Sequence, residues 1–257
     1  NWFIYCAEHY FYPIYERMHE YLIKRDLLHA DETTCQVLRE EGKSAESTSY
    51  MWIYLTGSDG LPPIILYDYA QGRAGNYAKD FLEGFAGLLQ CDGYQGYNKV
   101  ADVILVCCLA HCRRKFYEAI PAGRRKSLKL LDINSEEWLD DPDIPELSGL
   151  EQMIPAEVGL SYCNKLFYIE KTLKELPADE RKAKREELET PVWNGFWKWI
   201  VTINPLGGSK LQKAVNYALN HRETLCNYMK DGRCEISNNV AERRAKSYAI
   251  GRKAFLF

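Results

Sequence analysis

Hydrophobic positions in the first part of the chain gather into three strand-like runs. Runs with aromatic and β-branched residues cover 27–37, 49–56 and 64–69. Glycines at 57 and 60, followed by two prolines, separate the second run from the third and indicate a tight turn. These three runs therefore predict a meander of antiparallel strands.

Short apolar strands then alternate with helical segments. The pattern predicts a helix at 75–85, a strand at 88–91, a helical turn at 94–100 and a strand at 103–109. Strands that alternate with helices imply parallel pairing within one sheet. A meander followed by this alternation is the strand order of an α/β, RNase H-like (retroviral-integrase-like) mixed sheet of five strands.

The rest of the chain is predicted to be helical. Residues 1–24 form a leading helix in which Pro13 marks a kink or a start, and three apolar stripes run through 113–229. A turn at Asp231 and Gly232 precedes the final helix, which begins around 237–239. The expected organisation is a leading helix at 1–24, the first part of the core at 25–120, a large helical insertion at 121–230 and the last acidic helix within 231–257.

Composition narrows the class of protein. No apolar run is long enough to span a membrane and the first residues lack a signal-peptide pattern, so we expect a soluble, cytoplasmic protein. Nine scattered cysteines without a Cys-x-x-Cys pair favour reduced thiols over a disulfide framework. The cluster of Cys107, Cys108, His111 and Cys112 leaves a zinc site as an alternative, although its spacing matches no common zinc pattern.

Charge is distributed unevenly around a net value of −3. Basic residues gather between 113 and 129 and again between 243 and 253, whereas 132–151 is acidic. A charged run is often only a solvated face. The alternative is that the two basic segments form one face that binds the DNA backbone beside the active site.

Three acidic residues fall where the predicted sheet would bring them together. Asp31 ends the apolar start of the first strand, Asp92 closes the strand at 88–91, and Glu242 lies in the first turn of the last helix. Each also has a structural interpretation: a strand-end polar group for Asp31, a turn with Gly93 for Asp92, and a capping box with Asn239 at the N-cap for Glu242. Converging carboxylates are what metal-dependent phosphodiester chemistry requires.

Four ordered motifs resemble those of insertion-sequence-66 transposases. They are HADETTCQVL, GRAGNYAKDFLEGFAGLLQCDGYQGYN, CCLAHCRRKF and DGRCEISNNVAERRAKSYAIGRKAFLF. The resemblance covers the chain from about Leu22 to Phe257. It departs at Thr34, where the family usually has proline, and at Cys112, where the family has a small residue.

The resemblance implies a DDE transposase that cleaves DNA and transfers strands with Mg²⁺ or Mn²⁺, two ions in all. It assigns Asp31, Asp92 and Glu242 as catalytic metal ligands. Glu235 is the rival for the third position, in a short strand beside a turn. The resemblance also implies a longer protein with upstream zinc-binding and helix-turn-helix-like segments.

Expected partners are DNA at the element ends and target, further copies of the chain as a homo-oligomer on DNA, and accessory transposition proteins, with no membrane. The candidate DNA contacts are Arg73, His111, Arg113, Arg114, Arg243, Lys246 and Lys253. His111 has a packing or helix-capping role as its alternative. The alternative functions are an RNase H-like nuclease without strand transfer, and a catalytically silent, transposase-derived DNA-binding protein.

Overall fold

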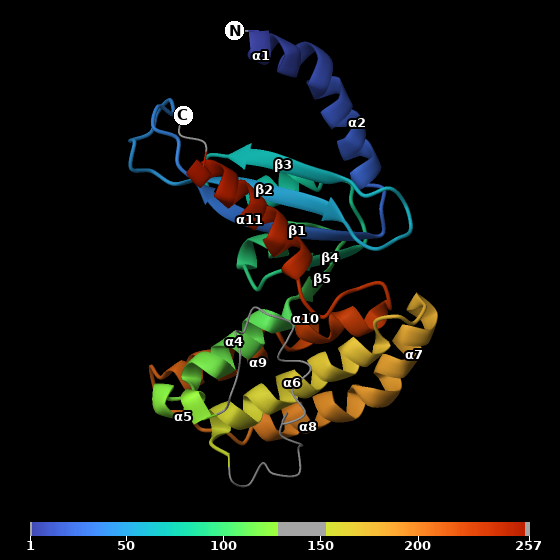
Figure 1. The fold of residues 1–257 in the computed structure, drawn as a ribbon, viewed down its shortest axis with the longest axis vertical. Coiled ribbons are helices and arrows are strands. Elements are labelled where there is room, and N and C mark those ends of the chain that lie inside the picture. The colour runs from blue at the N-terminus through green and yellow to red at the C-terminus, as the bar shows by residue number, and fades with distance from the viewer. Residues whose placement is uncertain (1, 128–152, 255–257) are drawn as a thin grey trace. The chain divides into compact units, whose positions relative to one another are not determined.

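The structure, a computed structural model, describes residues 2–127 and 153–254 (Figure 1). The chain folds into two compact units, one formed by residues 1–107 with 238–257 and the other by residues 108–237. We call them the sheet unit and the helical unit. Lys129 and the expected acidic segment at 132–151 lie outside the described residues.

A five-stranded mixed sheet forms the centre of the sheet unit. Its strands are β1 (Leu27–Cys35), β2 (Ser49–Thr56), β3 (Ile65–Ala70), β4 (Leu88–Cys91) and β5 (Ile104–Cys107). They lie in the order β3-β2-β1-β4-β5. The pairs β1–β2 and β2–β3 are antiparallel, and β1–β4 and β4–β5 are parallel. The predicted meander and the predicted parallel pairing are both present.

The two faces of the sheet are covered by different elements. On one face Leu28, Trp52 and Tyr54 pack with Ala78 of α3 (Asn76–Phe81) and with the 3-10 helix η2 (Gln95–Lys99). On the other face Ile53 and Leu55 pack with α11 (Asn239–Ala254), which crosses the sheet in Figure 1. Successive side chains of β2 point to opposite faces, so this strand supplies both cores.

The leading segment is helical, as predicted. It comprises α1 (Trp2–Cys6), a π-helical stretch η1 (Ala7–Phe11) and α2 (Tyr12–Leu22), with Pro13 in the first turn of α2. Only the end of α2 joins the core, where Leu22 is buried and Tyr15 and Met18 pack against it. The large apolar side chains before Tyr15 are mostly exposed.

The helix predicted at 75–85 is shorter in the structure. The helix α3 ends at Phe81, and Gly84 adopts φ +83°, a conformation that glycine tolerates and that cannot continue a right-handed helix. The strand predicted at 103–109 also ends early, because Leu109 already begins a helix. The predicted strands at 49–56 and 88–91 match β2 and β4.

The helical unit consists of helices packed around a core rich in aromatic residues. Its elements are α4 (Leu109–Ala119), α5 (Ala122–Ser127), α6 (Pro155–Leu173), α7 (Ala178–Leu188), α8 (Thr190–Ile200), α9 (Lys210–Asn220), α10 (Arg222–Cys226) and η5 (Asn227–Lys230). Helix α4 packs against α6 and α9, and α6 packs against α8. Phe116, Tyr162 and Phe196 meet edge to face in this core. The predicted apolar stripes on α6 and α8 are buried there.

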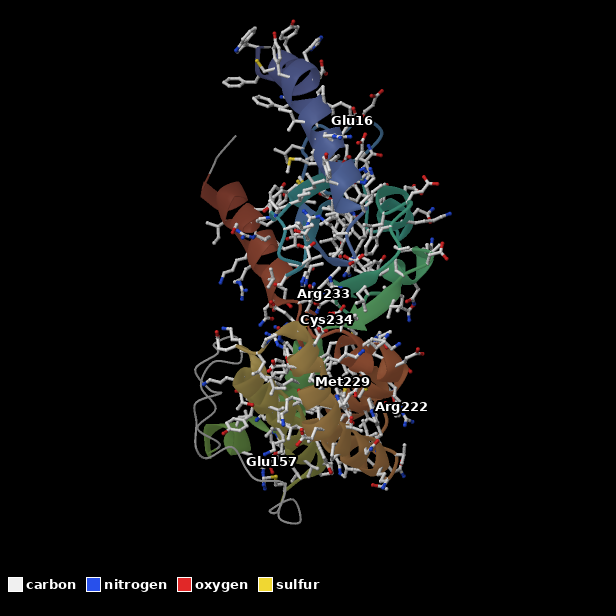
Figure 2. The ribbon with its side chains drawn as sticks, turned by 90° about the vertical axis from the view of Figure 1, so that its right-hand side faces the viewer. Glu16, Glu157, Arg222, Met229, Arg233 and Cys234 are labelled. Carbon is white, nitrogen blue, oxygen red and sulfur yellow. The ribbon has the colours of Figure 1, made fainter. Side chains whose placement is uncertain are left out.

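A buried arginine ties three parts of the helical unit together. Arg185 of α7 is fully buried, and its guanidinium donates two hydrogen bonds to the carboxylate of Glu170 on α6, at 2.6 and 2.7 Å. It also donates to the backbone carbonyls of Tyr228, Asp231 and Cys234. Figure 2 labels Cys234 beside Arg233. The segment that leaves the helical unit is therefore held by charge-assisted hydrogen bonds.

All nine cysteines lie in the described residues, and none of them forms a disulfide. Within the two described ranges, no helix combines the length and apolar character needed to cross a membrane.

Candidate active site

Asp31 lies on the face of the sheet that α11 covers. The antiparallel register pairs it with Ile53 of β2, and Ile53 packs against Ala241 and Ala245 of α11. Residues directly opposite each other on paired strands point to the same side. One carboxylate oxygen of Asp31 accepts a hydrogen bond from the backbone N–H of Glu32 at 2.9 Å.

Asp92 follows β4 immediately. The parallel register pairs His29 with Gln90, and its continuation by two residues brings Asp92 level with Asp31. The Asp92 Oδ1 atom accepts a hydrogen bond from the backbone N–H of Tyr94 at 2.8 Å, and its side chain is 23% exposed. Asp92 therefore does shape a turn, and this hydrogen bond also fixes the direction of its carboxylate.

Glu242 is placed by the start of α11. Asn238 directly precedes this helix and is buried, and its side-chain amide donates to the carbonyl of Ala30 at 2.9 Å. Its Oδ1 atom accepts a hydrogen bond from Nδ1 of His29 at 2.9 Å. Burial lowers the pKa of His29 to about 4, so the ring is neutral with its proton on Nδ1. These two bonds hold the first turn of α11 beside β1.

The capping-box alternative for Glu242 does not fit this helix start. Because α11 begins at Asn239, Asn238 occupies the position before the helix and Glu242 is its fourth residue. The backbone N–H of Glu242 donates to the carbonyl of Asn238 at 3.2 Å. Glu242 thus lies one position beyond the N3 site that a capping box requires.

The three acidic side chains lie close enough for their charges to interact. The pKa of Asp31 is raised to about 8, first by burial, then by the negative charge of Glu32, and further by Asp92 and Glu242. A buried carboxylate among other carboxylates is costly to ionise unless a cation offsets the repulsion. The nearest such cation at Asp92 is Arg73, whose Nη2 atom lies 3.8 Å from Asp92 Oδ2.

Glu32 and Arg73 form a pair that the sequence did not reveal. Neighbouring residues of a strand point to opposite faces, so Glu32 faces away from α11, and its side chain is 1% exposed. It accepts hydrogen bonds from Nε of Arg73 at 2.7 Å and from the hydroxyl of Tyr97 at 2.6 Å. The alternation of side chains along a strand could have predicted that Glu32 and Asp31 point to opposite faces. No pattern in the sequence indicated that Arg73 would pair with Glu32.

The remaining predicted DNA contacts occupy different environments. Arg243 and Lys246 are exposed on α11, and Lys253 lies in its last described turn, where side chains are not described. His111 and Arg114 are half-buried on α4 in the helical unit. Their belonging to one DNA-binding face remains a prediction.

Arg113 does not lie on the surface where the sequence analysis placed it as a candidate DNA contact. It is only 2% exposed, and its Nε atom donates to Oδ1 of Asn164 on α6 at 2.7 Å. Burial lowers its pKa to about 10. Leu109, Cys112 and Phe116 are buried on the same face of α4, so Arg113 belongs to the helical core rather than to a surface that reaches DNA.

Glu235 also differs from its predicted setting. It lies among turns and bends at 231–238, not in a strand. It belongs to the helical unit, whereas Glu242 belongs to the sheet unit together with Asp31 and Asp92. Because Glu242 lies in the same compact unit as Asp31 and Asp92, it is favoured over Glu235 as the third carboxylate.

The fold and the site together define a class: an α/β protein with a five-stranded mixed sheet and acidic side chains that approach one another from β1, the end of β4 and the first turn of α11. A family model described as "Transposase IS66 family" matches residues 1–257. The chain belongs to the IS66 transposase family.

Relatives among known proteins come from Sinorhizobium fredii (strain NBRC 101917 / NGR234). The uncharacterized protein y4hP is 27% identical over 95% of this chain and 43% of its own length. The uncharacterized protein y4qI is 27% identical over 93% of this chain and 42% of its own length. The chain therefore spans about two fifths of the length of these relatives.

Proposed function

We propose that this chain is the catalytic core of a DDE transposase, with Asp31, Asp92 and Glu242 as its acidic triad. The observation that carries the proposal is that the negative charges of Asp92 and Glu242 both act on the buried carboxylate of Asp31 within the sheet unit. They come from β1, from the end of β4 and from α11, so only the folded chain brings them together. Such convergence has no evident value for stability, because like charges repel.

The order of the elements supports an RNase H-like core. Three antiparallel strands come first in the chain. They are followed by β4, which pairs in parallel with β1, and by β5, which pairs in parallel with β4. The helix α11, which carries Glu242, covers one face of this sheet. The helical unit enters the chain between β5 and α11. This agrees with the insertion that the family resemblance implies.

The donor set fits divalent cations. The carboxylates of Asp31, Asp92 and Glu242 would hold Mg²⁺ or Mn²⁺, because hard cations prefer oxygen ligands and because a cation would relieve the repulsion that raises the pKa of Asp31. Two such ions would neutralise charge on the phosphate and activate the attacking oxygen. Burial of Asp31 keeps bulk water from screening these interactions.

The protein's own residues would orient the reaction. The N–H of Tyr94 fixes the Asp92 carboxylate, and Asn238 holds the start of α11 against β1. Water would attack a phosphodiester at the element end and release a 3′-hydroxyl, and that hydroxyl would attack target DNA and displace a 3′-oxygen there. Neither step needs a covalent protein nucleophile, so catalysis rests on positioning and charge.

The test is an assay on DNA that carries the ends of the insertion sequence, with both intact and pre-cut ends. We expect cleavage and joined strand-transfer products with Mg²⁺ or Mn²⁺, and neither in EDTA. Cleavage without joining of pre-cut ends would identify a nuclease instead. Binding with no cleavage in either metal would identify a silent DNA-binding protein.

A second prediction concerns the exposed face of α11. Replacing Arg243 and Lys246 with Ala should weaken binding to many DNA sequences alike, because phosphate contacts carry no sequence information. The slope of log affinity against log salt should flatten by up to about one unit for each lost phosphate contact.

The matched control is Lys79→Ala. Lys79 is exposed on α3, which packs on the opposite face of the sheet, so its loss should leave the salt slope unchanged. Loss confined to one DNA sequence, with an unchanged slope in the α11 variant, would assign Arg243 and Lys246 to base recognition instead.

A further inference from the structure

Arg73 is held by direct contacts with Glu32 and Tyr94. Its Nε and Nη2 atoms both bond to the Glu32 carboxylate, and its guanidinium lies over the ring of Tyr94, 4.1 Å from the centroid. Glu32 is in turn fixed by the hydroxyl of Tyr97. Tyr94 thus contacts the planar face of the guanidinium, and Glu32 binds one edge of it. The Nη2 atom on that edge also lies 3.8 Å from Asp92 Oδ2.

The loop that carries Arg73 is locked onto the segment that follows Asp92. The backbones of Gly75 and Gly96 approach so closely that a Cβ on Gly75 would overlap Gly96. Lys99 donates to the side chain of Asn76 at 2.8 Å, and the hydroxyl of Tyr94 bonds to the carbonyl of Arg73. The glycine-containing motifs around residues 75 and 96 thus pack against each other, and this contact fixes the Arg73 backbone.

We propose that Arg73, anchored by Glu32, is a positioning residue for Asp92 rather than a DNA contact. This inference rests on the proposed role of Asp92 as a catalytic carboxylate. Arg73 places a positive charge 3.8 Å from the outer oxygen of Asp92, while Tyr94 N–H holds the other oxygen. The two together set the direction of the carboxylate.

The role of Glu32 follows from the same geometry. Although it adjoins Asp31 in the sequence, its carboxylate is committed to Arg73 and Tyr97 on the opposite side of β1. Glu32 therefore acts as the counter-ion of Arg73 and not as a further ligand. Supporting residues of this kind typically change metal affinity or activity by 10- to 100-fold when they are lost.

The experiment compares Glu32→Gln, Arg73→Lys and the double variant with the intact protein. Lysine keeps the charge but cannot form the two-pronged bond to Glu32 or lie flat on Tyr94. We expect each single variant to raise the Mg²⁺ concentration for half-maximal cleavage about 10- to 100-fold. The double variant should be close to either single one, because the two residues act as a unit.

DNA affinity provides the discriminating measurement. A positioning role predicts that Arg73→Lys and Arg73→Gln leave the salt slope of DNA binding unchanged. A flattened slope for Arg73→Gln, with Arg73→Lys fully active and its Mg²⁺ midpoint unmoved, would overturn the proposal and make Arg73 a phosphate contact.

A buried ion pair elsewhere in the sheet unit serves as the control. Asp59→Asn removes the partner of Arg25, a pair 2.6 Å long with side chains 7% and 11% exposed, and should lower stability without moving the Mg²⁺ midpoint. Mn²⁺ binding to the intact protein separates the two proposals. If the unmodified protein neither binds Mn²⁺ nor cleaves DNA, the proposed function fails; if it does both and the Glu32 and Arg73 variants match it, only the positioning role fails.

Discussion

Asp92→Asn should abolish DNA cleavage and strand transfer, with a loss of roughly a thousandfold or more, while DNA binding and folding remain nearly intact. Asparagine removes the charge that a divalent cation needs but keeps an Oδ1 atom that can accept the hydrogen bond from Tyr94. The turn after β4 therefore survives. Single-turnover cleavage rates and a thermal melt of the same preparation provide the measurement.

The matched control for this substitution is Asp102→Asn. Asp102 is exposed in a turn before β5, at the opposite end of the paired strands β4 and β5 from Asp92, and its φ of 57° suits asparagine. It should cleave at the normal rate. The contrary outcome is an Asp92→Asn protein that largely unfolds, while its remaining folded fraction cleaves DNA with the same metal dependence as the intact protein. Asp92 would then have a purely structural role.

The largest stability effect is expected for Arg185→Ala in the helical unit. This change leaves the Glu170 carboxylate partly buried without its partner and removes the donors to the carbonyls of Tyr228, Asp231 and Cys234. Breaking a buried ion pair by removing one side costs about 3–5 kcal/mol. The helical unit should therefore melt on the order of 10 °C lower, as followed by far-ultraviolet circular dichroism.

Lys184→Ala is the control for Arg185→Ala on the same helix. The Lys184 side chain is 50% exposed and its ion pair with Glu187 lies at the surface, so the change should stay within about 0.5 kcal/mol. Equal melting temperatures for the two variants would show that the bonds of Arg185 add little net stability.

Strand positions could be predicted from the sequence because short apolar runs, bounded by turn residues, are typical of buried strands. The runs at 49–56 and 88–91 match β2 and β4, and the order of elements followed from the switch between alternation and helical spacing. Ends of helices were less accessible. The helix predicted at 75–85 ends at Phe81, because Leu82 already leaves the helical conformation with φ −93° and ψ 14°, and periodicity does not reveal such a change.

Two outcomes at the site show what pattern alone misses. The sequence grouped Arg113 with a basic cluster at the surface. In the structure Arg113 shares the buried face of α4 with Leu109, Cys112 and Phe116. The helical spacing of these apolar residues was therefore a better guide to the burial of Arg113 than its charge. The pairing of Glu32 with Arg73 depends on the path of a loop 41 residues further along the chain. No local rule fixes such a path.

The location of Glu242 on α11 has a consequence for the order of synthesis. A ribosome makes Asp31 and Asp92 early, then the whole of residues 108–237, and only afterwards the helix that brings the third carboxylate. At usual elongation rates this interval is on the order of ten seconds. Under the proposed function, the nascent chain has two of the three acidic residues for that time without a complete triad, so DNA cleavage near its own gene has to await synthesis of α11.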